Sequence, residues 1–591
     1  MIRRITQGMR WLLRPVAAQW PLFVLCWLAM ALQGVLDVWR LSEFEFLTTA
    51  YALGLLHIVV RNVCFSAVVA WAVSLVATMT RRRWLCWLLA LAAMVVLAVG
   101  MFVRYHYGTR LTPEIATVIA ETNRSEATEY LQTYVLSRAG LLFVGVFVLA
   151  IGAYAWASAR WCRRAHQVSR WGASVALPVI PLVLCEAVWT VGLWPSKHSP
   201  VSRYENFGVD AVTNVLLCRQ AMAQVDNQVM RVVKATERVY AQPSAPLQSD
   251  SLALVLVIGE SYIKAHAGIY GYHLPTTPRQ QAEYEAGRLV VMRDMVAPYH
   301  YTNMALRSML STSNEAQGQQ WCDSPLVMAI FKHAGYHVDM WDNQREFLHD
   351  TQETRGLNGL FYHRQVMNLC YDRINDQNFE FDGELVSDYA RQRRDAAHQL
   401  VVLHLRGQHI RAERRYPHTA QWLRFSARDY VDRHEPFLDA DAIDKIAHYD
   451  NATRYNDAVL GEVFDLFANR QAVVVCVSDH GDEVYDYRDS QGRRDDREHP
   501  ELMVRYQHEV PMVVWISPAF MTAHADVVQR LRQAASRPGT TDNLSQLLLG
   551  LGGITSPYYR PWLDIHSDDY RPPRRIVRKT YDYDRLLQQG Q

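Results

Sequence analysis

The chain has 591 residues, half of them hydrophobic, and a formal net charge of +2 at pH 7. This length allows two or more domains, and the near-neutral charge excludes the basic surface typical of nucleic-acid-binding proteins. Because Leu, Val, Ala and Trp dominate residues 1–200 but not the rest, the chain is expected to combine a membrane-embedded part with a soluble part.

Five apolar stretches are long enough to cross a bilayer as helices. They cover residues 17–37, 55–78, 84–103, 139–159 and 172–195. Arg clusters precede the first stretch, separate the second from the third, and separate the fourth from the fifth. Because short Arg-rich loops stay in the cytoplasm, we expect a cytoplasmic N-terminus and an external position for everything after residue 196.

The sequence between the spans and the soluble part is expected to form helices and a linker. The loop at 104–138 has helical periodicity and would lie at the outer membrane face. Residues 201–250 read as bridging helices that end in the Pro- and Ser-rich segment AQPSAPLQSD. We therefore predict a five-helix transmembrane domain at 1–200 and a separate external domain at 251–591.

The external domain is expected to have an α/β fold with a mostly parallel sheet. Short apolar runs alternate there with helical patterns, as crossover units require. The runs are LALVLVIG, YHVDMW, QLVVLHL, AVVVCVS and VPMVVWIS. Cys322 and Cys370 also fall in this domain, where oxidation is permitted, so a disulfide between them is possible; their spacing does not decide it. Cys476, within one of the runs, is expected to be buried.

Two of these runs lead into side chains that bind metals. LVLVIGES leads into Glu260, and VVVCVSDHGD leads into Asp479 and His480. In open α/β sheets, active sites form at the carboxyl ends of the strands. We expect Gly259 and Gly481 to let the chain turn at these ends. A carboxylate after a buried strand is costly unless it is paired or binds a metal, although Glu260 alone could equally be a helix cap or a surface acid. Two carboxylates and an imidazole together suit Zn²⁺, with Mn²⁺ as the second candidate.

Thr302 is the candidate nucleophile. It precedes NMALRSML, which has a helical pattern, so its side chain would lie at a helix N-terminus. Backbone N–H groups and the helix dipole favour a phosphate at that position. A bound metal would also activate the hydroxyl for attack on phosphorus. The alternative is a threonine that only caps the helix.

Two histidines are expected near a phosphate at the same edge of the sheet. His409 follows the run QLVVLHL, and His499 lies between the DHG segment and the next run. Either imidazole could protonate a leaving oxygen or bind a phosphate. Three other histidines are expected to be structural: His266, His404 and His508.

The segment GESYIKAHAGIYGYHLPTTP resembles the signature of bacterial phosphoethanolamine transferases of the alkaline phosphatase and sulfatase superfamily. That family includes enzymes that modify lipid A and lipopolysaccharide core, and the mobile colistin-resistance enzymes. Four matches follow the order of the family: GES…YGY…TTP, a Thr followed nine positions later by Ser, GQH…RYP, and SDHGDEVYD. The resemblance extends over nearly the whole chain, including the five spans.

The resemblance implies a role for each matching residue. The implied zinc ligands are Glu260, Thr302, Asp479 and His480. Thr302 would also carry the phosphoethanolamine, with His409 and His499 as the catalytic histidines beside the phosphate. The implied substrate-binding residues are Thr122 and Glu126 in the periplasmic loop, and Asn343 and Gln344 in WDNQ.

The resemblance further implies a zinc-dependent, multi-pass enzyme of the bacterial inner membrane with a periplasmic catalytic domain, acting as a monomer. The donor would be phosphatidylethanolamine from the surrounding lipids. The acceptor would be lipid A, a lipopolysaccharide core sugar or another envelope glycan, and the added amine would reduce binding of cationic peptides such as polymyxin. HGDEVYD and GQH…RYP resemble the core-sugar branch more closely.

Three other functions are possible for such a chain. A phosphoglycerol transferase shares the topology and the threonine chemistry, but YGY…TTP argues against it. A sulfatase would need a C/S-x-P-x-R motif, which the sequence lacks. A receptor or scaffold without activity would have no reason to place these side chains at the ends of strands and helices.

Overall fold

The structure is a computed structural model that describes residues 14–41, 49–80, 83–107, 124–164, 227–243, 251–345, 359–496 and 498–589. The chain divides into two compact units. One comprises Met1–Ala116 and Tyr130–Ala221, and the other comprises Thr117–Glu129 and Met222–Gln591. The first unit is helical where it is described, and the second contains the sheets.

The helices of the first unit form where the apolar stretches predict them. They are α2 (Trp20–Leu41), α3 (Thr49–Thr80), α4 (Arg83–Tyr107) and α7 (Arg138–Arg164). Two segments are long and apolar enough to cross a membrane, Trp84–Val103 in α4 and Gly140–Arg160 in α7. By the same measure, α2 and α3 contain only shorter apolar segments, Trp20–Ala31 and Ser66–Thr80. The fifth predicted stretch, 172–195, lies outside the described residues.

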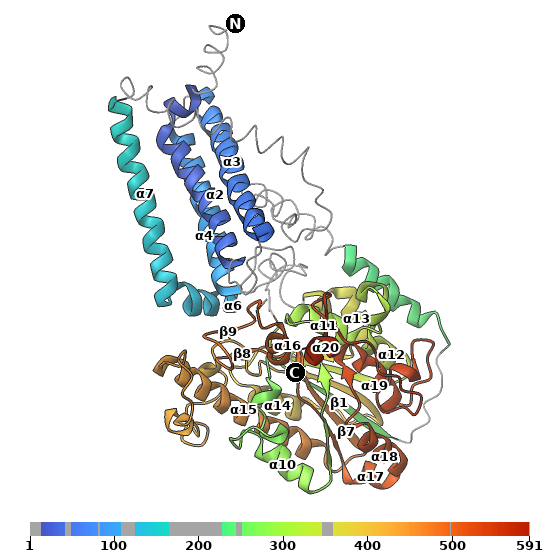
Figure 1. The fold of residues 1–591 in the computed structure, drawn as a ribbon. Helices are drawn as coiled ribbons and strands as arrows, with labels where there is room; N and C mark the ends of the chain where they lie inside the picture. Colours follow the sequence, from blue (N-terminus) through green and yellow to red (C-terminus); the bar gives the residue numbers. More distant parts are fainter. Residues whose placement is uncertain are drawn as a thin grey trace. The chain divides into compact units, whose positions relative to one another are not determined.

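These helices pack against one another and leave apolar side chains exposed. Helix α2 contacts α3, α4 and α7 (Figure 1), with the buried side chains of Leu22 and Cys26 in the shared core. On α7, by contrast, Leu142 and Leu149 are 70% and 74% exposed. Such an apolar face on a helix of this length is typical of a surface that contacts lipid.

The loop between α4 and α7 is partly described. It forms the short helix α6 (Arg124–Tyr130) and a π-helical turn, Leu131–Val135. The predicted helix start near residue 112 and Thr122 lie outside the described residues, as does the side chain of Glu126. In the bridging region, one helix spans residues 227–240, and its Val232 and Val233 are buried in the core of the second unit.

The second unit is built around a seven-stranded sheet of order β2-β10-β7-β1-β6-β4-β5. The strands are β1 (Leu252–Gly259), β2 (Leu289–Met292), β4 (His337–Asp342), β5 (Arg373–Ile374), β6 (His398–His404), β7 (Ala472–Ser478) and β10 (Met512–Ile516). Five of them coincide with the five apolar runs. Strand β10 is antiparallel to both β7 and β2, whereas the pairs among β7, β1, β6, β4 and β5 are parallel. The predicted mostly parallel α/β sheet is confirmed.

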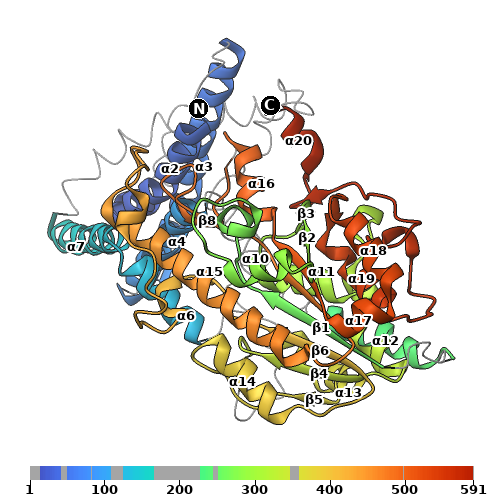
Figure 2. The same cartoon turned by 90° about the horizontal axis from the view of Figure 1, so that it is seen from below.

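Alternate residues of β1 face two separate cores. Leu254 and Leu256 belong to a core shared with α12 (Val327–His333) and α19 (Leu544–Leu551), whereas Val255 and Val257 belong to a core shared with α15 (Ala440–Phe467). Figure 2 shows α15 and α14 (Asp382–Gln392) on one side of the sheet and α12 and α19 on the other. Because both faces are covered, β1 is apolar throughout and only its ends can carry polar chemistry.

Smaller elements complete the second unit. The helices are α10 (Pro278–Glu285), α11 (Thr302–Leu310), α13 (Arg364–Cys370), α16 (Pro500–His508), α17 (Pro518–Ala523), α18 (Ala525–Ala534) and α20 (Tyr583–Gln589). Two-residue strands form three further pairs: β3 (Met295–Val296) with β11 (Gly539–Thr540), β8 (Glu483–Val484) with β9 (Gln491–Gly492), and β12 (Ile576–Val577) with β13 (Tyr581–Asp582).

The cysteines of the second unit are buried thiols. Cys322 and Cys370 lie in the same apolar core but are not joined in a disulfide, so the pairing that the sequence left open is not formed in this structure. Burial raises the pKa of the Cys370 thiol to about 12. Cys476 is buried in the middle of β7, as predicted.

Candidate metal and nucleophile site

Glu260 directly follows β1, which lies between β6 and β7, and its side chain is fully buried. The expectation that Gly259 makes the turn is wrong, because the left-handed residue is Ser261, with φ +57°. A side chain in this conformation is strained unless its surroundings hold it. Two contacts do so: the Tyr449 hydroxyl donates to Ser261 O at 2.7 Å, and Ser261 N donates to Asp479 Oδ1 at 3.0 Å.

Asp479 and His480 follow β7, which ends one residue earlier, at Ser478. Both residues therefore lie beyond the strand, where neighbouring side chains no longer have to point to opposite faces of the sheet. A Cβ atom on Gly481 would lie 2.1 Å from the carbonyl oxygen of Tyr506. Only glycine fits this close approach, so Gly481 is needed for space; its φ is not positive, and the expected left-handed turn is not found there.

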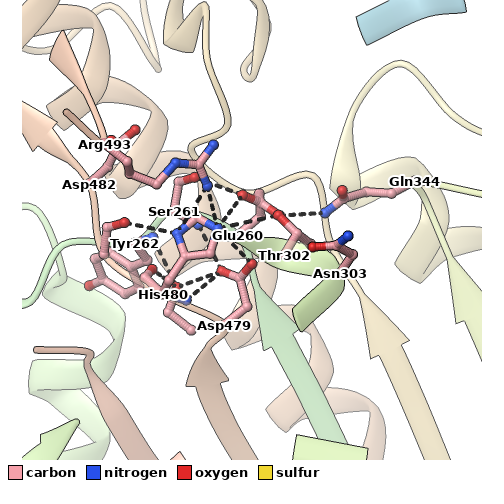
Figure 3. Close-up of polar contacts among 12 residues, drawn as sticks. Glu260, Ser261, Tyr262, Thr302, Asn303, Gln344, Asp479, His480, Asp482 and Arg493 are labelled. Atoms are coloured by element: carbon pink, nitrogen blue, oxygen red, sulfur yellow. Dashed lines mark hydrogen bonds and ion pairs between the residues drawn. The ribbon is translucent and has the colours of Figure 1, made fainter. Parts of the chain in front are cut away.

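The side chains of Glu260, Asp479 and His480 converge (Figure 3). Each offers one ligand atom, and these atoms lie within 4.8 Å of one another. His480 Nε2 is 3.4 Å from Glu260 Oε1 and 3.0 Å from Asp479 Oδ2. His480 Nδ1 lies 2.8 Å from Gly481 O, which can only accept, so Nδ1 carries the proton and the Nε2 lone pair faces the carboxylates. The parallel strands β1 and β7 thus bring two distant segments into one cluster.

Thr302 is the first residue of α11, and its hydroxyl belongs to this cluster. Its Oγ1 donates to Glu260 Oε2 at 3.0 Å and lies 3.2 Å from His480 Nε2. The residue at the N-cap position is Tyr301. The alternative of a threonine that only caps the helix is therefore excluded.

The charges of the cluster fit a divalent cation. Burial and the adjacent Glu260 raise the pKa of Asp479 well above its usual range. Burial also acts on Glu260, but His480, His409 and Arg493 outweigh it and lower the pKa of Glu260. Asp479 Oδ2 is buried without a hydrogen-bond donor. Two converging carboxylates, one with an unsatisfied oxygen, cost free energy that a cation bound between them would remove. Carboxylate and imidazole ligands at these positions suit zinc.

Sequence reasoning missed Arg493 and Asp482. The short β8–β9 pair places Arg493 directly after Gly492, and its Nη1 donates to His480 Nε2. Burial by itself lowers the pKa of Arg493, but Asp482, Glu260 and Asp479 outweigh it and raise that pKa. Burial raises the pKa of Asp482 to about 7. No periodicity marks Arg493, because it follows an irregular loop; only its place after a glycine near the DHG segment could have drawn attention to it.

The two candidate catalytic histidines differ in their surroundings. Burial lowers the pKa of His409 to about 4, although Glu260 opposes this shift. His409 also contributes to the lowered pKa of Glu260, so it lies in the electrostatic environment of the cluster. The side chain of His499 is 58% exposed at the start of α16, and its Nδ1 lies 3.8 Å from Glu501 Oε1. Within the described residues, no hydrogen bond or ion pair joins His499 to the cluster.

Of the two WDNQ residues, only Gln344 reaches the cluster. Its Nε2 lies within hydrogen-bond distance of Glu260 Oε2 at 3.2 Å and of Leu405 O at 2.7 Å. The amide of Asn343 instead donates to Asp382 Oδ1 at 2.9 Å and accepts from the backbone N–H of Phe379 at 2.7 Å. Asn343 thus supports the strand end, and Gln344 orients Glu260.

His266, which was expected to be structural, connects the segment after β1 to α15 and to the loop after the DHG segment. His266 Nδ1 lies 2.7 Å from Asp450 Oδ1 on α15, and Nε2 lies 2.9 Å from Asp486 Oδ1 beyond the DHG segment. Burial lowers the pKa of His266, but the two carboxylates outweigh burial and raise it to about 10. His404 and His508 are likewise buried and hydrogen-bonded, to Asp342 Oδ1 and Ala297 O.

Comparison with characterised proteins identifies phosphoethanolamine transferases as similar to this chain in sequence and in fold. The chain is 25% identical to the phosphoethanolamine transferase EptC of Escherichia coli (strain K12) over 507 residues, 81% of this chain and 83% of EptC. The solved C-terminal periplasmic domain of EptC from E. coli, 26% identical, aligns with a TM-score of 0.50 over 59% of this chain and 99% of that chain.

A full-length relative has the same overall fold. The integral membrane protein lipooligosaccharide phosphoethanolamine transferase A (EptA) of Neisseria meningitidis aligns over 93% of this chain and 97% of that chain, with a TM-score of 0.61 and 19% identity. The resemblance to phosphoethanolamine transferases is confirmed. A family model described as Sulfatase matches residues 253–554, just over half of the chain, and the chain therefore belongs to the sulfatase family.

Proposed function

We propose that this protein transfers phosphoethanolamine from phosphatidylethanolamine to a lipopolysaccharide acceptor through a covalent intermediate on Thr302. One observation carries the proposal: the Thr302 hydroxyl lies at the N-terminus of α11 and within hydrogen-bond distance of both Glu260 and His480. A hydroxyl beside metal ligands, with helix N–H groups behind it, is suited to attack on a phosphodiester. The relatives named as phosphoethanolamine transferases support this choice of phosphodiester.

The chain's own residues account for the first half of the reaction. Thr302 Oγ1 attacks phosphorus, an O–P bond forms, and the bond to the diacylglycerol oxygen breaks. The hydroxyl proton is already directed at Glu260 Oε2, which is the nearest acceptor. His409 is neutral at pH 7 because burial lowers its pKa to about 4, so it must first take up a proton before it can give one to the leaving oxygen. The role of His499 in the same step stays a prediction.

In the second half, an acceptor hydroxyl or phosphate oxygen attacks the same phosphorus and Thr302 is released. Glu260, Asp479, His480 and Thr302 would hold a zinc ion, with Mn²⁺ as the second candidate. When bound, such an ion stabilises negative charge on the threonine oxygen and on the phosphoryl group. Gln344 keeps Glu260 oriented through its 3.2 Å contact.

The location that fits this chemistry is the bacterial inner membrane. We propose a transmembrane domain of five helices at 1–200, bridging helices at 201–250 and a periplasmic catalytic domain at 251–591. The exposed apolar face of α7 and the two membrane-length segments support a membrane domain. The donor is then supplied by the outer leaflet. Thr122 and Glu126, and Asn343 with Gln344, stay proposals as substrate-binding residues.

The leading alternative is a phosphoglycerol transferase, which would use the same cluster on a different headgroup. Sulfatase activity does not follow from the family name, because the sequence has no C/S-x-P-x-R motif. The relatives named as acting on Kdo(2)-lipid A, such as the enzyme of Salmonella typhimurium at 27% identity, cover 53% of this chain. These names support a lipopolysaccharide acceptor, and lipid A, a core sugar or another envelope glycan are the candidates.

The deciding experiment is expression of the wild-type protein and of Thr302→Ala in a strain that lacks phosphoethanolamine transferases. Mass spectrometry of lipid A and of core sugars should show one added phosphoethanolamine group with the wild type and none with the variant. The wild type should also carry the adduct on the peptide containing Thr302. Transfer by Thr302→Ala, or an added phosphoglycerol group, would refute the proposal.

A further inference from the structure

Arg493 is a basic residue that reaches the carboxylate cluster from the segment directly after β9. Figure 3 shows its side chain beside Asp482, with the guanidinium directed at His480. Its guanidinium donates to His480 Nε2 and lies 5.8 Å from the centre of the Tyr301 ring, next to Thr302 in the sequence. The guanidinium is thus close to the oxygen that would attack phosphorus.

The β8–β9 hairpin, which Arg493 directly follows, is held firmly. Arg488 Nε donates to Glu483 Oε2 at 2.8 Å, and its Nη1 donates to Asp496 Oδ2 at 2.9 Å, which closes the loop between β8 and the residues after β9. Gly492 has φ +102°, a conformation that other residues adopt only with strain, and so allows the turn that directs Arg493 inward. A long cationic side chain placed by a braced hairpin has lost most of its conformational freedom before any ligand arrives.

The hydrogen bond to His480 competes with metal binding. Nδ1 of His480 is used by Gly481 O, so Nε2 offers one lone pair, and Arg493 Nη1 points at it. A metal ligated by this imidazole needs the same lone pair. When His480 binds a metal, the N–H groups of Arg493 must find other acceptors. Asp482 meanwhile holds the guanidinium cation beside the cluster. A divalent cation would offset the charges of Glu260 and Asp479 and would leave the Arg493 guanidinium available to a phosphate.

We propose that Arg493 is a phosphate-binding residue, which releases His480 when the metal binds and holds the non-bridging oxygens of the phosphodiester that Thr302 attacks. The planar guanidinium fork matches two phosphate oxygens, and the Tyr301 ring nearby supports its orientation. This inference rests on the proposed function only for the identity of the phosphodiester; the ligand chemistry it requires is a phosphate oxyanion beside a metal.

A different role would give a different result on substitution. Arg493 could instead be only a counter-ion that holds the carboxylates of Glu260, Asp479 and Asp482 together. In that case its loss would weaken metal binding. If it competes for His480 Nε2, its loss leaves zinc affinity unchanged or raises it, while phosphate affinity falls. The two roles therefore predict opposite combinations of zinc and phosphate binding.

The test uses the full-length protein in detergent micelles as wild type, Arg493→Gln and Arg493→Lys. Arg391→Gln serves as a matched control, because Arg391 is 67% exposed on α14 and pairs with Asp388. Zinc affinity is measured by competition with a chromophoric chelator, and binding of inorganic phosphate to the zinc-loaded protein is measured by calorimetry. We expect Arg493→Gln to bind phosphate about 10- to 100-fold more weakly, the range for a lost hydrogen bond to a charged group. Its zinc affinity should equal or exceed that of the wild type.

The phosphate affinity of Arg493→Lys should fall between those of the wild type and Arg493→Gln, because a single ammonium cannot form the paired contact. Arg391→Gln should match the wild type. Unchanged phosphate affinity in Arg493→Gln, or zinc and phosphate affinities that fall together, would overturn the proposal. If Arg493→Gln shows no cooperative thermal unfolding, Arg493→Lys decides: weaker phosphate binding with wild-type zinc affinity supports the proposal, and wild-type phosphate binding refutes it. Wild type that binds phosphate through Arg493 but transfers no phosphoethanolamine would refute the proposed function alone.

Discussion

Thr302 Oγ1 donates a hydrogen bond to Glu260 Oε2 at 3.0 Å, although the two residues are 42 positions apart. The bond joins the first turn of α11 to the end of β1. It directs the hydroxyl proton toward a carboxylate that is also a candidate metal ligand. The nucleophile, its proton acceptor and the metal position are therefore parts of one arrangement, and a change in one should be measurable in the others.

Two replacements of Thr302 should distinguish the contribution of its hydroxyl to catalysis from that of its side-chain shape. Thr302→Ser keeps the oxygen but loses the β-branch that restricts χ1, so we expect transfer to persist at a level reduced about tenfold. Thr302→Val keeps the shape and lacks the oxygen, and its transfer should fall on the order of 10³-fold or more. Turnover of a fluorescent phosphatidylethanolamine in micelles measures both. Comparable activity in the Ser and Val variants would contradict a nucleophilic role.

Zinc should stabilise the catalytic unit through Asp479. Saturation at about 100 times the dissociation constant adds roughly 2.7 kcal/mol to the free energy of unfolding, which thermal melts with and without zinc detect. Asp479→Asn should lose this zinc-dependent increase. Asp526→Asn, at a side chain that is 70% exposed, is the control and should keep it.

The raised pKa of Asp479 makes a further prediction for the metal-free protein. A carboxyl whose pKa is higher in the folded than in the unfolded state stabilises the fold only while it is protonated. In a chelator, the stability of the wild type should therefore fall as pH rises above about 3.8, the value for an unfolded Asp, relative to Asp479→Asn. Melts between pH 4 and pH 8 measure this difference, and a constant difference would argue against the raised pKa.

The Tyr449 hydroxyl should control the position of Glu260. It donates to Ser261 O at 2.7 Å and accepts from Ile263 N at 2.8 Å, so it fixes the left-handed turn. Tyr449→Phe should cost about 1–3 kcal/mol of stability and weaken zinc binding. Tyr455→Phe is the matched control, because this buried hydroxyl on the same helix accepts from Gly383 N at 3.0 Å. It should lose similar stability but keep zinc affinity; equal zinc affinity in both variants would contradict the prediction.

The buried His266 should make stability decrease at high pH. Its folded pKa of about 10 lies above the unfolded value of 6.5, so its contribution is complete below pH 6.5 and is lost as pH rises toward 10. Urea unfolding of wild type and His266→Gln across this range should give a stability difference that shrinks with pH. In an Asp450→Asn background the decrease should still begin near pH 6.5 but should be smaller and end at a lower pH, because one of the two carboxylates that raise the folded pKa is gone.

The two candidate catalytic histidines should differ in their effect on transfer. His409 is electrostatically coupled to Glu260, whereas His499 is 58% exposed and its imidazole pairs with Glu501, outside the cluster. We expect His409→Gln to lower kcat by about 10²-fold, the lower range for loss of general acid–base catalysis, and His499→Gln to lower it less. A larger loss for His499→Gln than for His409→Gln would contradict this order.

The sequence was sufficient for the strands and for the side chains at their ends. Buried parallel strands are continuous apolar runs, so β1, β6 and β7 could be recognised from composition alone, and a polar residue directly after such a run stands out. The edge strand β2, which was not predicted, is also apolar and buried but only four residues long. In the membrane part, hydropathy predicted the stretches, but two of them have the required length within the described helices.

Only the tertiary structure decided which side chain makes the turn after β1 and what surrounds the cluster. Ser261 takes the left-handed conformation in place of Gly259 because Tyr449, 188 residues away, holds its carbonyl group. Arg493 reaches His480 because a two-residue strand pair folds its loop inward. Sequence patterns report local periodicity and burial, and so they locate Glu260, Asp479 and His480. Contacts between distant loops leave no period in the sequence, and they appear only when the chain is folded.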